Sequence, residues 1–73
     1  MKIIATEDKI VVLNNVKNVT LYQDGTGSIR NPFEYWIGIE YFKNESSSIK
    51  FGKDEKKAKE TLKEIAEILS KND

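Results

Sequence analysis

The chain has 73 residues, which is enough for one domain and too few for two domains that each bury a core. It contains neither Cys nor His, which excludes disulfides, thiolate chemistry and the commonest zinc ligands, so we expect no metal and no cofactor. Twelve Lys and Arg balance twelve Asp and Glu, and this zero net charge disfavours nucleic acids and anionic membranes as general partners.

The N-terminal part consists of short apolar runs separated by polar clusters. Runs over 3–5, 10–13 and 16–22 are rich in β-branched residues, which predicts two or three strands. Asn14 and Asn15 either turn the chain or kink one long strand, because Asn tolerates the left-handed conformation. No apolar run has the length of a signal peptide or of a membrane span, so we expect a cytoplasmic protein.

A loop is predicted over 24–32, where turn-forming residues gather. Its Gly25-Thr26-Gly27-Ser28 segment superficially suggests a phosphate cradle. In such motifs, however, the glycines lead into a helix whose N-terminus holds the anion, whereas here they lead to Pro32 and a strand. Arg30 is the only cation of this loop, and it is a weak candidate for anion binding.

The clearest strand is predicted over 34–43, followed by a polar turn and a last strand over 47–51 that completes a hairpin. Large apolar side chains alternate onto both faces of the first of these strands. One face carries Tyr35, Ile37, Ile39 and Tyr41, and the other carries Trp36, Gly38, Glu40 and Phe42.

A C-terminal amphipathic helix is predicted to begin after Asp54, whose carboxylate suits an N-cap. Its apolar stripe should pack on the sheet. The predicted core consists of Ala58, Leu62, Ile65 and Leu69 from the helix and of Val19, Leu21, Ile37, Ile39, Ile49 and Phe51 from the strands. The fold class is therefore α+β, a single domain over 1–73 with an antiparallel sheet of four to five strands and one helix on one face.

The residue types disfavour an enzyme. Without His or Cys, the chain lacks the commonest general base and the strongest nucleophile. The acidic pairs Glu7-Asp8 and Asp54-Glu55 lie at a turn and at a helix start, where carboxylates have structural roles. We also expect so small a domain to lack a deep cleft of several hundred Å³, roughly the size of ligand pockets, that would exclude water and shift a pKa.

The strand face opposite the helix is the best candidate for a binding surface. Trp36 and Phe42, with Tyr22 and Thr20 of a neighbouring strand, are expected to form an apolar patch there. The predicted interaction surface consists of Tyr22, Trp36, Gly38, Glu40, Phe42 and Lys50. Gly38 would leave space for a partner's ring, and Lys50 would neutralise Glu40 across the interface.

Three partners are compatible with this surface. A second copy of the chain is favoured, because a small domain without disulfides or metal gains most from self-association. The homodimer would form through the face that carries Trp36 and Phe42, or through an exposed edge strand beside it. A different protein is the second possible partner. Single-stranded nucleic acid, with its unpaired bases stacked on Trp36, Phe42 or Tyr22, is the alternative from another class of function.

The order of strands, final hairpin and helix after Ile49-Lys50-Phe51-Gly52-Lys53-Asp54 resembles the second half of pleckstrin-homology-like domains. It is also similar to small uncharacterised α+β proteins of low-GC bacteria and their phages. The resemblance covers residues 10–70 and rests on the pattern of elements. A complete barrel of that family has seven strands and this chain has room for about five, so the resemblance does not extend to phosphoinositide binding.

Overall fold

The computed structural model describes residues 1–71 and contains five strands and one helix. In chain order these are β1 (Ile3–Ala5), β2 (Ile10–Val12), β3 (Val16–Asp24), β4 (Glu34–Tyr41), β5 (Ser46–Gly52) and α1 (Glu55–Ser70). The predicted α+β class, with antiparallel strands and a C-terminal helix packed on them, is confirmed.

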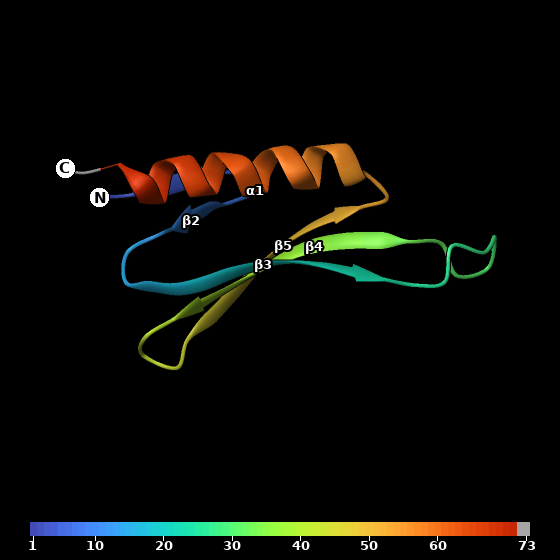
Figure 1. Ribbon diagram of the computed structural model, residues 1–73, viewed down its shortest axis with the longest axis horizontal. Coiled ribbons are helices and arrows are strands. Elements are labelled where there is room, and N and C mark those ends of the chain that lie inside the picture. Colours follow the sequence, from blue (N-terminus) through green and yellow to red (C-terminus); the bar gives the residue numbers. More distant parts are fainter. Residues whose placement is uncertain (72–73) are drawn as a thin grey trace.

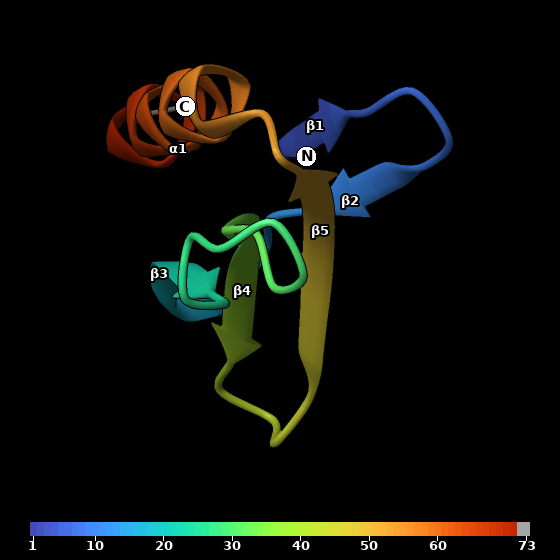
Figure 2. The same ribbon diagram turned by 90° about the vertical axis from the view of Figure 1, so that its right-hand side faces the viewer.

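The strands form two antiparallel sheets, a β1–β2 hairpin and a three-stranded sheet in the order β3-β4-β5. The hairpin and α1 lie side by side on the same face of the three-stranded sheet, as Figure 1 and Figure 2 both show. The molecule therefore has two layers, with the core between them. The sequence pattern alone did not reveal that the N-terminal strands belong to the helix layer.

Strand β4 is central because its apolar side chains alternate. Tyr35, Ile37 and Ile39 point into the core, and the two isoleucines are completely buried. The strand ends at Tyr41, two residues before the predicted end. Asn44 in the following turn adopts a positive φ of 59°, and the Tyr41 N–H donates to the Glu45 carbonyl, so Phe42 belongs to the turn.

Helix α1 begins as predicted, because the Asp54 carboxylate accepts a hydrogen bond of 3.0 Å from the Lys57 N–H. Ala58 and Ile65 are buried against the sheet, and Leu62 is partly buried beside them. Within residues 1–71, no helix is long and apolar enough to cross a membrane.

The hairpin extends the core beyond the residues that the pattern predicted. Ile4, Val11 and Leu13 are buried and belong to the same cluster as Ile37, Ile39, Ile49 and Ile65. Among the predicted core residues, Val19, Leu21, Phe51, Leu62 and Leu69 are partly buried against this cluster. The prediction of which residues form the core is thus confirmed but incomplete.

Two tyrosines of β4 connect the layers. The Tyr41 hydroxyl donates a hydrogen bond of 2.6 Å to the Val12 carbonyl at the end of the hairpin. Burial raises the pKa of the Tyr41 phenol above 10.0, and Glu45 contributes to the rise. Burial also raises the pKa of Tyr35, with a contribution from Glu55. The Tyr41 phenol therefore stays protonated and able to donate at neutral pH.

Shortening a buried side chain should distinguish the core from the surface. We expect Ile65→Val to lower the free energy of unfolding by ~1 kcal/mol, because Ile65 is 1% exposed. The matched change Ile29→Val, at a fully exposed loop residue, should stay within ~0.5 kcal/mol of wild type. Urea unfolding measures both values, and equal losses at the two positions would contradict the packing of α1.

Candidate interaction surface

The outer face of the β3-β4-β5 sheet, on the side away from α1, is formed by side chains in three cross-strand rows. Each row takes one residue from each strand. The rows are Tyr22–Trp36–Lys50, Thr20–Gly38–Ser48 and Asn18–Glu40–Ser46. The register therefore brings five of the six predicted surface residues onto one face, and Phe42 is the exception because it lies beyond the end of β4.

An aromatic pair occupies one end of this outer face. The rings of Tyr22 and Trp36 are stacked, with centroids 4.2 Å apart and an interplanar angle of 14°. Both rings lean over Gly38, where an added Cβ would lie 2.8 Å from Tyr22 Cε2. The space above Gly38, which we expected to receive a partner's ring, is thus filled by a ring of the same chain.

The rest of the outer face is polar. Glu40 is exposed and accepts a long hydrogen bond of 3.4 Å from the Asn18 amide. Thr20 and Lys50 are also exposed, and Ser48 is partly buried. Since Phe42 lies in the turn, the apolar area of this face comes from the Tyr22–Trp36 pair, which buries part of its own surface. The face is a poorer apolar patch than the sequence suggested.

The loop between β3 and β4 does not offer a phosphate cradle. The Thr26 and Gly27 N–H groups both donate to the Asn31 carbonyl at 3.0 Å. The Gly25 N–H donates to the Asp24 carboxylate at 2.8 Å. These amides are therefore engaged within the loop and are not directed at an anion. Arg30 is exposed on this loop and is not part of the outer-face rows.

A groove of about 590 Å³ lies between the β1–β2 turn, β5 and the first half of α1. The volume is larger than we expected for a domain of this size, but the groove is open, and charged residues that line it, such as Glu7 and Lys57, are exposed to solvent. The groove exists because the hairpin packs on the sheet beside the helix without closing against β5. Ile4, Ile49 and Phe51 contribute apolar lining, and acidic and basic side chains lie around it.

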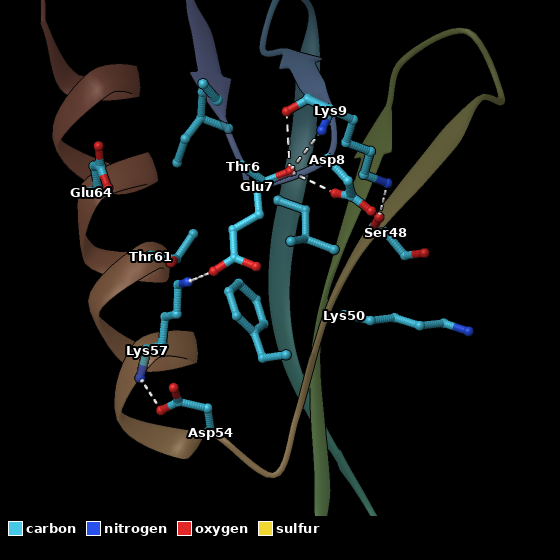
Figure 3. A pocket seen from close by; sticks show the side chains of 14 residues that line it. Thr6, Glu7, Asp8, Lys9, Ser48, Lys50, Asp54, Lys57, Thr61 and Glu64 are labelled. Carbon is cyan, nitrogen blue, oxygen red and sulfur yellow. Dashed lines mark hydrogen bonds and ion pairs between the residues drawn. The ribbon is translucent and has the colours of Figure 1, made fainter.

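Several charged groups of the groove are engaged by neighbouring groups, as Figure 3 shows. Lys57 on α1 forms an ion pair of 2.7 Å with Glu7 on the β1–β2 turn. The hydrogen bond and the charge of Glu7 raise the pKa of Lys57. A raised pKa keeps an amine protonated, which is the opposite of what a nucleophilic lysine requires. Asp8 accepts from the Thr6 hydroxyl at 3.1 Å, and Asp54 caps the helix.

One edge of β5 is open toward this groove. Within residues 1–71, β5 pairs with β4 and with no other strand. The Ser48 carbonyl accepts from the Lys9 ammonium of the hairpin, so it points away from β4. Because a strand residue directs its N–H and C=O to the same side, the outward-directed residues of β5 are Ser46, Ser48 and Lys50. Lys9 thus occupies one acceptor on an otherwise unpaired edge.

The contribution of Lys9 and of the hairpin was not predicted. The 3–5 and 10–13 runs were interpreted as strands, but nothing in their composition indicates which sheet they join. The sequence gives no signal for this placement, because Ile4 and Val11 are flanked by the apolar residues Ile3, Ala5, Ile10 and Val12, and such continuous runs are typical of strands buried on both faces. The structure instead buries Ile4 and Val11 and leaves Ile3, Ile10 and Val12 exposed.

Comparison with known proteins gave no match to a family model, to a curated protein or to a solved structure. The resemblance to pleckstrin-homology-like domains therefore stays a prediction, and function must be argued from the site itself.

Gly38 and Tyr22 should be energetically coupled. We expect Gly38→Ala to be less favourable, by about 1 kcal/mol, in wild type than in a Tyr22→Ala background, because its Cβ displaces the Tyr22 ring from Trp36. A double-mutant cycle from urea unfolding gives this coupling, and the fluorescence of the single Trp reports the loss of stacking. An equal effect of Gly38→Ala in both backgrounds would contradict the observed packing.

Proposed function

We propose that this protein is a non-catalytic protein-interaction module that assembles as a homodimer through its three-stranded sheet. The single observation that carries the proposal is the incomplete sheet. Helix and hairpin cover one face of β3-β4-β5, and β5 keeps three outward-directed residues on an edge that no other strand of the described chain pairs. An unpaired strand edge is a template for pairing with another chain.

Self-association also suits the size of the domain. A chain of 73 residues buries a smaller fraction of its surface than larger domains do, and this chain has no Cys for a disulfide. Its fully buried large side chains are Leu13, Ile37, Ile39 and Ile65. A second copy would extend the sheet and add buried surface without any further element of the chain.

Binding of single-stranded nucleic acid is the second candidate. The observation that favours it is the stacked Tyr22–Trp36 pair, with Lys50 in the same cross-strand row. Bases stack on such rings, and a nearby cation attracts phosphate. The zero net charge of the chain weighs against it. Quenching of Trp36 fluorescence by oligonucleotides at low salt, reversed when salt is added, would favour this candidate over the homodimer.

Light scattering tests the homodimer directly. At roughly 50 µM, where an association free energy of about −6 kcal/mol leaves the dimer half dissociated, we expect an average mass clearly above the 8.4 kDa of the chain, rising toward twice that value at higher concentration. A wild type that stays monomeric at this concentration would contradict the proposal.

The variant Thr20→Glu distinguishes a dimer that forms through the outer face of the sheet from one that forms through the edge of β5. It places a charge in the middle of the outer face and leaves the β5 edge unchanged. We expect this variant to remain dimeric, with Ile29→Glu on the β3–β4 loop as the matched control. Loss of the dimer in Thr20→Glu alone would place the contact on the outer face.

A further inference from the structure

The free edge of β5 is complementary to itself. We infer that the dimer forms by antiparallel pairing of β5 with β5 of a second copy, with the two Ser48 residues opposite each other on the two-fold axis. This inference rests on the proposed function, because it names the surface through which that homodimer assembles. It follows from the cross-strand register, the charges of the outer face and the groove beside the edge.

Backbone pairing, together with the positions and charges of the side chains, favours this register. In an antiparallel ladder, residues that direct their N–H and C=O outward face each other as hydrogen-bonded pairs. Centring the pair on Ser48 places Ser46 opposite the partner's Lys50, so all three outward-directed residues of each strand are used. Centring it on Lys50 would oppose two ammonium groups, and centring it on Ser46 would leave Lys50 beyond the partner's strand.

Hydrogen bonds at the end of β4 independently support which residues of β5 direct their N–H and C=O groups outward. The Phe42 N–H donates to the Asn15 carbonyl, on the β3 side, and the Tyr41 N–H donates to the Glu45 carbonyl, on the β5 side. Even-numbered residues of β4 therefore bond toward β3 and odd-numbered ones toward β5. Ile37 bonds to Ile49 across the ladder, which leaves Ser48 and Lys50 directed away from β4.

The charges of the outer face match in this register. Lys50 would lie beside the partner's Ser46, and the next residue in that row is the partner's Glu40. Two strand spacings separate them by roughly 10 Å at the backbone, which a Lys and a Glu side chain can bridge over a small serine. Within one chain, Glu40 and Lys50 lie in rows four residues apart along the strand, roughly 13 Å, so they do not pair there.

The edge has room for the second strand. The groove lies along 48–51, and two of the three outward-directed residues of β5, Ser46 and Ser48, are small. Lys50 points away from the helix, toward the side on which the partner's outer face would continue (Figure 3). The Lys9 ammonium occupies the Ser48 carbonyl, where the partner's Ser48 N–H would donate, so this long side chain must move aside when the dimer forms.

Charge reversal tests the register. We expect Lys50→Glu and Glu40→Lys each to raise the dimer dissociation constant by about fivefold or more, and the double variant to restore it to within about twofold. Lys43→Glu, in the β4–β5 turn, is the control for net charge. All three positions are exposed, and circular dichroism confirms folding. A double variant as weak as the sum of the single ones would overturn the inference.

Cross-linking tests the axis. The chain has no Cys, so Ser48→Cys introduces a single thiol. Opposed residues of a hydrogen-bonded antiparallel pair have Cα atoms about 5.5 Å apart, within the range of disulfides. We expect mild oxidation of the folded variant to give a covalent dimer and the control Thr20→Cys, on β3, to stay unlinked.

The outcomes separate the two proposals. A wild type that dimerises by light scattering, while Ser48→Cys fails to cross-link and charge reversal has no effect, overturns the β5 register and leaves the homodimer in place. A wild type that stays monomeric overturns both, and Lys9 would then protect the edge of β5 against pairing.

Discussion

Burial of one face of a three-stranded sheet is the constraint on which the rest of this structure depends. Ile37 and Ile39 of the central strand are completely shielded, and this requires a cover wider than one helix. The helix supplies Ala58 and Ile65, and the N-terminal hairpin supplies Ile4 and other residues beside it. Both coverings lie on the same side of the sheet, so a single core fills the space between the two layers.

The remaining features follow from that one-sided arrangement. On the outer face, the large rings of Tyr22 and Trp36 stack on each other and fill the space above Gly38, which limits their exposure. The rest of that face is polar, so the described chain leaves it to solvent without a large apolar patch. The hairpin does not continue the sheet at β5, and within the described chain the Lys9 side chain supplies the hydrogen bond that joins it to the edge of that strand. The outer edges of β3 and β5 are therefore both unpaired by other strands of the described chain, and the edge of β5 is the one beside the groove.

Local patterns predicted the elements well, because each depends on nearby residues. Period-two alternation identified β4, and the Asp54 cap identified the start of α1. The end of β4 was wrong by two residues, since a left-handed Asn44 closes the turn earlier than the apolar Phe42 suggested. The β-propensity of single residues does not predict whether the chain turns at this point or continues as a strand for one more residue.

Long-range placement was beyond the sequence. The position of the hairpin depends on contacts between residues such as Ile4 and Ile65, which are distant in the chain and are not fixed by any local period. The groove and the Lys57–Glu7 ion pair follow from that placement, so they could not be predicted either. The candidate surface was predicted in composition, apart from Phe42. That the Tyr22 ring fills the space above Gly38, and that the edge of β5 beside this surface is unpaired, could be seen only in the three-dimensional structure.

The central claim is that the edge of β5 is open in one chain and closed by a second copy. Amide hydrogen exchange at two protein concentrations tests it most directly, because the outward-directed Ser48 and Lys50 amides differ from Ile49, which bonds to β4. We predict that Ser48 and Lys50 exchange fast in dilute protein and slowly in concentrated protein, while Ile49 stays slow in both. Exchange at Ser48 and Lys50 that does not depend on concentration would contradict the account.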